Sequence, residues 1–95
     1  MPAWRAGSHA ASQATAVVDE STTLGDDTVV WSHACLGAGV VVGQACRIGH
    51  GAYVDRGVRL GDRVVLQTGA SVFRPFVLGD DVFIGPHACL TNDRD

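Results

Sequence analysis

Three histidines, His33, His50 and His87, are the side chains in this chain best suited to proton transfer. An imidazole titrates near neutral pH, so it can take a proton from a reacting group and release it again. His33 and His87 share one register of the repeat described below, and His50 lies one residue away from that register. Each of the three could equally be a solvated corner residue. His9 lies near the N-terminus, and we assign it no role.

Glycine offers a second kind of chemistry. A glycine corner exposes its backbone amide without a side chain in the way, so it could donate a hydrogen bond to a tetrahedral oxyanion. The candidate amides belong to Gly49, Gly51, Gly69 and Gly85. Turn geometry alone would also explain each of these glycines. Gln67 and Phe73 replace glycine at corresponding positions, where an outward side chain could contact a substrate or a neighbouring subunit.

A six-residue repeat must position all of these groups. Aliphatic residues recur at every sixth position: Val18, Leu24, Val30, Leu36, Val42, Ile48, Val54, Leu60, Leu66, Val72, Leu78, Ile84 and Leu90. No α-helix has a strict period of six, whereas hexapeptide repeats are typical of a parallel β-helix. Each hexad then supplies one short strand and one corner. The sequence therefore predicts an all-β fold with these side chains pointing inward.

The other hexad positions agree with this interpretation. If the aliphatic residue is position one, position five is small or apolar apart from Thr22 and Thr28, and glycine concentrates at positions two and four. Glycine is expected where the backbone needs a positive φ or passes close to another segment. Three hexads make one triangular coil, and coils stack about 4.8 Å apart. We predict about four coils over residues 17–95, broken off at the C-terminal end, with residues 1–16 outside the repeat as a tail or cap.

Composition narrows the function classes. The net charge of −3 argues against a nucleic-acid surface. Apolar runs are too short to cross a membrane, and there is no signal-peptide core, so we expect a soluble cytoplasmic protein. The three cysteines show no CxxC spacing, and we predict reduced thiols with Cys46 in the core.

Three segments resemble a known family: TAVVDE at 15–20, VVWSHA at 29–34 and LGDDVFIGPHACLTND at 78–93. They are similar to segments of bacterial nucleotide-linked amino-sugar N-acetyltransferases, within the hexapeptide-repeat acyltransferase superfamily. The resemblance implies a left-handed β-helix, a homotrimer, and transfer of acetyl from acetyl-CoA to an amine of a UDP- or dTDP-linked sugar. The family has histidine directly after the tryptophan and again three residues later, where this chain has Ser32 and Cys35.

The resemblance also implies a role for Asn92, and the other assignments rest on residue type and hexad position. Asn92 would lie beside the reactive amine and orient its lone pair toward the thioester. We assign catalysis to Asn92, His50 and His33, and we assign acetyl-CoA binding to Gly69 and Gly85. We assign substrate binding to Gln67, Phe73, Asp93 and His87. We assign no metal ligand.

Two other functions are compatible with the repeat. A non-catalytic trimeric scaffold is the first. The second is a zinc hydrase similar to the gamma-class carbonic anhydrases, which the segment Ile48-Gly49-His50-Gly51-Ala52 weakly resembles. Those enzymes pair two histidines five residues apart, and this chain has no such pair. We therefore favour the acetyltransferase.

Overall fold

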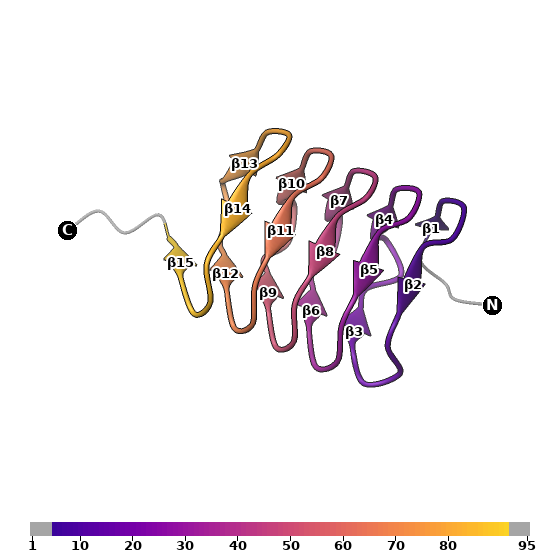
Figure 1. The fold of residues 1–95 in the computed structure, drawn as a ribbon, viewed down its shortest axis with the longest axis horizontal. Coiled ribbons are helices and arrows are strands. Elements are labelled where there is room, and N and C mark those ends of the chain that lie inside the picture. Colours follow the sequence, from indigo (N-terminus) through magenta and orange to yellow (C-terminus); the bar gives the residue numbers. More distant parts are fainter. Residues whose placement is uncertain (1–4, 92–95) are drawn as a thin grey trace.

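The computed structural model describes residues 5–91, which form three parallel five-stranded sheets wound into a triangular prism (Figure 1). Sheet 1 contains β1 (Arg5–Ala6), β4 (Thr23–Leu24), β7 (Val41–Val42), β10 (Arg59–Leu60) and β13 (Val77–Leu78). Sheet 2 contains β2 (Ala11–Ser12), β5 (Val29–Val30), β8 (Arg47–Ile48), β11 (Val65–Leu66) and β14 (Phe83–Ile84). Sheet 3 contains β3 (Val17–Val18), β6 (Cys35–Leu36), β9 (Tyr53–Val54), β12 (Ser71–Val72) and β15 (Cys89–Leu90). Within residues 5–91 there is no helix long and apolar enough to span a membrane.

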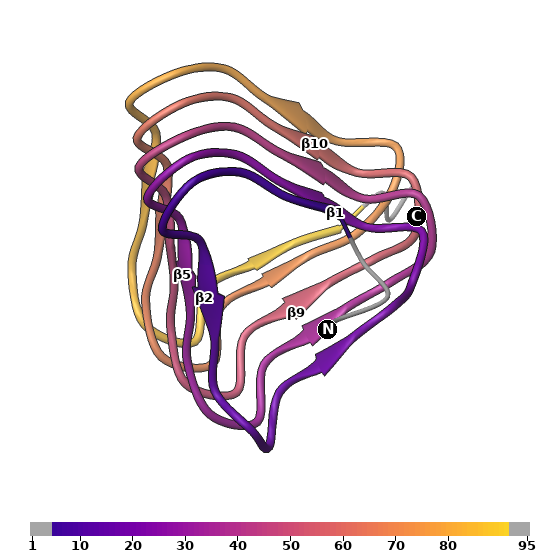
Figure 2. The ribbon, with the colours of Figure 1, turned by 90° about the vertical axis from the view of Figure 1, so that its right-hand side faces the viewer.

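The prism is a left-handed β-helix, as predicted. Seen from its N-terminal end, the chain runs anticlockwise from β1 to β2 and onward as it recedes from the viewer (Figure 2). Consecutive strands lie on different faces, and each strand pairs in register with the strand one full coil later, for example Leu24 with Val42. Each face is therefore built from every third hexad of the sequence.

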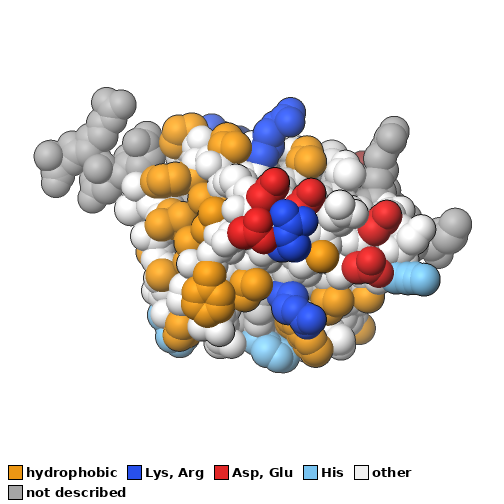
Figure 3. All heavy atoms as spheres, turned by 45° about the horizontal axis from the view of Figure 1, so that its top comes forward, with side chains coloured by type: hydrophobic (Ala, Val, Ile, Leu, Met, Phe, Trp, Pro, Cys, Tyr) orange, Lys and Arg blue, Asp and Glu red, His pale blue; other side chains and the backbone are white. Residues whose placement is uncertain are grey.

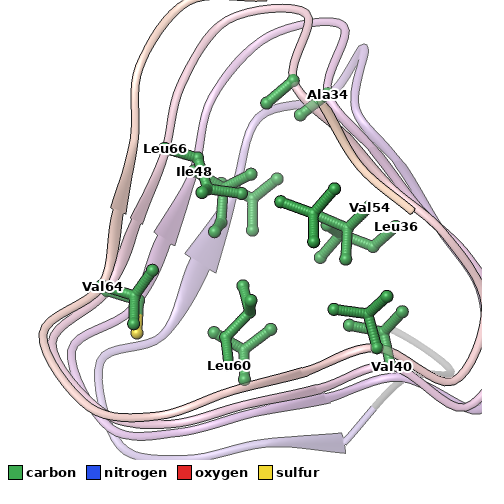
Figure 4. Close-up of a cluster of buried hydrophobic side chains, with 14 of the residues drawn as sticks. Ala34, Leu36, Val40, Ile48, Val54, Leu60, Val64 and Leu66 are labelled. Atoms are coloured by element: carbon green, nitrogen blue, oxygen red, sulfur yellow. The ribbon is translucent and has the colours of Figure 1, made fainter. Parts of the chain in front are cut away.

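The repeated aliphatic side chains fill the interior of the prism, as the period of six predicts. Position one is buried without interruption from Leu24 to Val72, and the small residues of position five are buried between the same layers. Figure 4 shows side chains from all three faces pointing toward the axis, including Leu36, Ile48 and Leu60. Each two-residue strand thus directs one side chain inward and one outward.

The β-helix begins earlier than the sequence predicted. Residues 1–16 were expected outside the repeat, but β1 pairs with β4 and β2 pairs with β5. Here Ala6 and Ser12 take position one in place of a large aliphatic residue. Backbone pairing continues there without a large inward side chain, which is why aliphatic spacing alone does not detect this first coil.

Glycines at positions two and four serve different physical needs. At position four, Gly39, Gly51, Gly57 and Gly69 have φ between 66° and 73°, so they occupy the left-handed region. At position two the constraint is close approach instead: a Cβ on Gly43 would lie 2.6 Å from the carbonyl carbon of Gly61. Both expected uses of glycine are therefore present, each at its own position in the hexad.

The two polar residues predicted at inward positions are buried and hydrogen-bonded. The Thr28 hydroxyl donates to the Gly43 carbonyl oxygen at 2.7 Å and accepts from the Cys46 amide at 3.1 Å. The Thr22 hydroxyl donates to the Gly37 carbonyl oxygen at 3.2 Å. Cys46 is itself fully buried, as predicted, and burial raises the pKa of its thiol. Hydrogen bonding thus compensates for placing hydroxyl groups in an apolar core.

The crowding at position two leads to a first prediction. Gly43→Ala should lower the free energy of unfolding by about 2–3 kcal/mol, because the added methyl group would overlap the next coil. Gly39→Ala is the matched control: nothing lies within 4 Å of its added Cβ, but its φ is +70°. It should cost only about 1 kcal/mol, the strain of a left-handed alanine. Urea unfolding of both variants measures the difference, and equal costs would contradict the close-approach explanation.

Candidate functional site

The prism has three corners with different chemistry. We define the histidine corner as residues 13–16, 31–34, 49–52, 67–70 and 85–88, which link sheets 2 and 3 along the lower side of Figure 1. The acidic corner comprises residues 7–10, 25–28, 43–46, 61–64 and 79–82, on the upper side of the same view. The aromatic corner comprises residues 19–22, 37–40, 55–58 and 73–76, between sheets 3 and 1.

The histidine corner collects most of the predicted site residues that the structure describes. His33, His50 and His87 all lie there and are exposed, together with Gln67, which is half-buried. His33 and His87 occupy position four with φ of 62° and 60°, in the same column as Gly51 and Gly69. The strand spacing places His33 and His87, three coils apart, about 14 Å from one another along the prism. His33 and His50 lie in successive coils, as expected, on adjacent columns.

Two hydroxyl residues at this corner were given no functional role from the sequence. Ser32 and Thr68 lie in the column of His50, one coil before it and one coil after it. The spacing of 32, 50 and 68 by one full coil was the available signal. These hydroxyls give the corner short donors and acceptors on either side of the imidazole.

The glycine amides are less available than the sequence suggested. The Gly49 amide donates to the Leu66 carbonyl oxygen at 2.7 Å, and the Gly51 amide donates to the Ser32 carbonyl oxygen at 3.0 Å. The Gly69 amide donates to the His50 carbonyl oxygen at 2.8 Å. These three amides hold neighbouring coils together, so the hypothesis that they stabilise an oxyanion is wrong. Gly85 lies at the same corner, and its carbonyl oxygen accepts from the Ala88 amide at 3.3 Å.

Side chains also pack against one another along this corner. The rings of Trp31 and His50 have centroids 5.5 Å apart and are tilted by 35°. The His87 imidazole lies over Gly69, because a Cβ added to Gly69 would come within 2.7 Å of His87 Cε1. Gly69 therefore provides both the left-handed backbone of its own corner and the space that the His87 ring occupies.

Phe73 lies at a different corner from Gln67, although the sequence grouped the two. Phe73 belongs to the aromatic corner, where its ring centroid is 5.3 Å from that of Tyr53. The two residues follow different strands, β12 and β11, whose ends point to different corners of the prism. They are one hexad apart, and a hexad advances the chain by one face. Asn92 and Asp93 lie outside the described residues.

Asp55 organises the aromatic corner. Its carboxylate accepts hydrogen bonds from the Arg74 amide at 3.2 Å, the Arg56 amide at 2.9 Å and the Tyr53 hydroxyl at 3.2 Å. The Arg74 amide is the main reason that the pKa of Asp55 lies below its ordinary value. Burial, together with the neighbouring Asp55, raises the pKa of Tyr53. The network fixes the segment that carries Phe73.

The aspartates of the acidic corner hold neighbouring coils together through hydrogen bonds. The Asp62 carboxylate accepts a hydrogen bond from the Gln44 amide of the preceding coil at 2.9 Å. The Asp80 carboxylate accepts one from the Asp62 amide in the same way, at 2.7 Å. Arg63 pairs with Asp81 through two hydrogen bonds of 2.7 and 3.1 Å, which lower the pKa of the Asp81 carboxyl. Figure 3 shows acidic and basic side chains gathered on this surface. Within residues 5–91, no three His, Cys, Asp or Glu side chains form a group that could hold a metal ion.

Comparison with known proteins agrees with this architecture. Residues 39–74 match the family described as the hexapeptide repeat of succinyl-transferase. The predicted resemblance to hexapeptide-repeat acyltransferases is confirmed. No curated protein sequence matches this hexapeptide-repeat chain.

Two similar solved structures come from Caulobacter crescentus. One is a variant of perosamine N-acetyltransferase in complex with CoA and GDP-perosamine, with a TM-score of 0.63 and 24% identity. The other is a second variant of this GDP-perosamine N-acetyltransferase with the same ligands, with a TM-score of 0.59 and 26% identity. Each alignment covers 85% of the present chain and 47% of the other chain. This hexapeptide-repeat chain thus spans about half the length of these structures.

The Asp55 network leads to a pH prediction. A lowered pKa in the folded state means that the ionised Asp55 carboxylate stabilises the protein above the ordinary aspartate range. That contribution is lost as the pH falls through the folded-state pKa. Asp55→Asn should therefore be less stable than the parent near neutrality, and the difference should shrink between about pH 5 and pH 2. Urea unfolding across this range measures it.

Glu20→Gln is the control for the Asp55 experiment, because Glu20 is an exposed carboxylate at the same corner. Its substitution should leave the pH dependence of stability close to that of the parent. A constant stability difference between Asp55→Asn and the parent at every pH would contradict the proposed contribution of the Asp55 carboxylate.

Proposed function

We propose that this chain carries the catalytic β-helix of an acetyl-CoA-dependent N-acetyltransferase acting on an amine of a nucleotide-linked sugar. The observation that carries the proposal is the gathering of His33, His50 and His87 on one corner of a hexapeptide-repeat prism. The likeness at 26% identity to an N-acetyltransferase in complex with CoA and GDP-perosamine supports the same reaction. The sequence resemblance implied a UDP- or dTDP-linked acceptor, and this neighbour adds a GDP-linked sugar to the candidates.

The reaction needs one proton-accepting group near the amine. The neutral amine nitrogen attacks the thioester carbonyl carbon, and the carbonyl oxygen becomes an oxyanion. His50, with His33 beside it in the preceding coil, accepts the proton that the nitrogen loses. Collapse of the tetrahedral intermediate breaks the carbon–sulfur bond, and the CoA thiolate leaves and takes up a proton. The products are an acetamido sugar and CoA, and no covalent enzyme intermediate forms.

The remaining roles are those assigned in the sequence analysis. Asn92 orients the amine, while Asp93, Gln67 and His87 contact the acceptor. Phe73 contacts the acceptor from the neighbouring corner. Gly69 and Gly85 line the acetyl-CoA path. An added Cβ on Gly85 would meet nothing within 4 Å, whereas the His87 ring packs over Gly69, so Gly69 takes part through the position that it allows this ring to adopt.

The proposed assembly is a cytoplasmic homotrimer. The histidine corner is exposed in the single chain, so a groove that encloses CoA has to be completed by another prism. A trimer places the corner of one prism against the face of the next. The chain spans 47% of the length of this structural neighbour. We therefore assign no residue of this chain to the pantetheine or adenine group of CoA.

Thiol release from acetyl-CoA tests the function directly. The acceptor panel consists of UDP-, dTDP- and GDP-linked amino sugars, with GDP-perosamine included. We expect turnover with at least one acceptor and none without an acceptor. An intact trimer that turns over no member of the panel would contradict the proposal and favour a scaffold role.

A substitution at the histidine corner tests the proposed base. His50→Gln should lower kcat by about a hundredfold or more, because proton transfer contributes at least that much to such reactions. His9→Gln is the control, since His9 lies at the acidic corner, and its kcat should stay within about twofold of the parent. Thermal unfolding of each variant separates lost catalysis from lost structure. An unchanged kcat in His50→Gln would remove His50 from the mechanism.

A further inference from the structure

We propose that Trp31 is a positioning residue for the His50 imidazole. The indole would hold the ring in the orientation from which it accepts the amine proton. This inference rests on the proposed function and deepens it, because it selects His50 among the three histidines and names the group that orients it.

The backbone around this pair is held by three hydrogen bonds between coils. The Trp31 amide donates to the Ile48 carbonyl oxygen at 2.9 Å, and the Gly51 amide donates to the Ser32 carbonyl oxygen at 3.0 Å. The His50 carbonyl oxygen accepts from the Gly69 amide at 2.8 Å. The Cα atoms that carry the two rings are therefore held by pairing on both sides of His50, and rotation of the side chains is the remaining freedom.

The ring contact limits that freedom. The centroids lie 5.5 Å apart at a tilt of 35°, within the range in which aromatic rings attract one another. His50 is exposed and Trp31 is half-buried, so the less exposed ring supports the more exposed one. Gly49, directly before His50, lies in the register of Trp31 one coil later and has no side chain to displace the indole from the imidazole.

His50 differs in this respect from the other two histidines. Within residues 5–91, the aromatic contacts are Trp31 with His50 and Tyr53 with Phe73, so neither His33 nor His87 has an aromatic partner. Both of these also lie in the left-handed region, whereas His50 does not. A general base has to be held within hydrogen-bonding reach of its proton, and small misplacements are costly to the rate.

The test combines kinetics with a spectroscopic measurement. In Trp31→Leu we expect kcat to fall about tenfold with KM unchanged, since the substitution disturbs orientation of the base and not acceptor binding. Trp31→Phe retains an aromatic ring and should recover most of the loss. Phe83→Leu is the matched control, because Phe83 is an outward aromatic residue on the neighbouring sheet 2, 62% exposed. It should leave kcat unchanged.

Proton NMR of the imidazole ring reports the contact independently of activity. The indole ring current should shift the His50 ring protons, and this shift should disappear in Trp31→Leu. The His33 and His87 signals should not move, which makes them internal references. Thermal unfolding verifies that each variant is folded.

Each outcome decides the proposal. If the His50 signals move in Trp31→Leu but kcat does not, the contact exists without a positioning role, and the proposal is overturned while the function stands. If the His50 signals do not move, the contact itself is absent. If the parent turns over no acceptor, the function fails and the catalytic role fails with it, whatever the NMR spectrum shows. Loss of kcat together with the shift, restored by phenylalanine, supports the proposal.

Discussion

Hydrogen bonding between successive coils is the constraint on which the rest of the structure depends. Strand amides donate forward to the next coil, as Val29 does to the Cys46 carbonyl oxygen at 3.0 Å. Corner amides donate backward, as Ala45 does to the Asp26 carbonyl oxygen at 2.7 Å. Because both directions are used at every central coil, successive coils of this chain keep the same length, and the strict period of the sequence reflects this.

This constraint also determines how chemistry can be placed on the molecule. The inward positions are filled mainly by apolar side chains, and the amides at hexad positions two and four of the central histidine corner, such as those of Gly49, Gly51 and Gly69, bond between coils. Chemistry at this corner therefore falls mainly to outward side chains, and residues one full coil apart line up along a corner. His33, His50 and Gln67 thus lie in successive coils of the same corner, on adjacent columns, while the amides of Gly51 and Gly69 are used in bonds between coils. A site on such a prism is built from side chains on a rigid backbone.

The likeness to the Caulobacter crescentus structures extends over one part of those proteins. It covers 85% of this chain but 47% of the neighbours, so the shared unit is the stack of coils that carries the corners. Hexapeptide stacks are quasi-one-dimensional, and each coil contacts mainly its neighbours. Local geometry at a corner can therefore be compared between such proteins.

The sequence by itself determined the architecture, because one inward side chain per hexad is a local requirement that aliphatic spacing reveals. It determined the core from Leu24 to Val72, the use of glycine at two hexad positions and the burial of Cys46. It missed the first coil, where Ala6 and Ser12 replace the aliphatic signal but backbone pairing persists. Tertiary structure alone decided which partners each outward group meets. Trp31 packs against His50, Phe73 packs against Tyr53, and the Gly69 amide donates a hydrogen bond to the His50 carbonyl oxygen. These contacts join different coils, so they depend on the directions of side chains and amides that aliphatic spacing does not reveal.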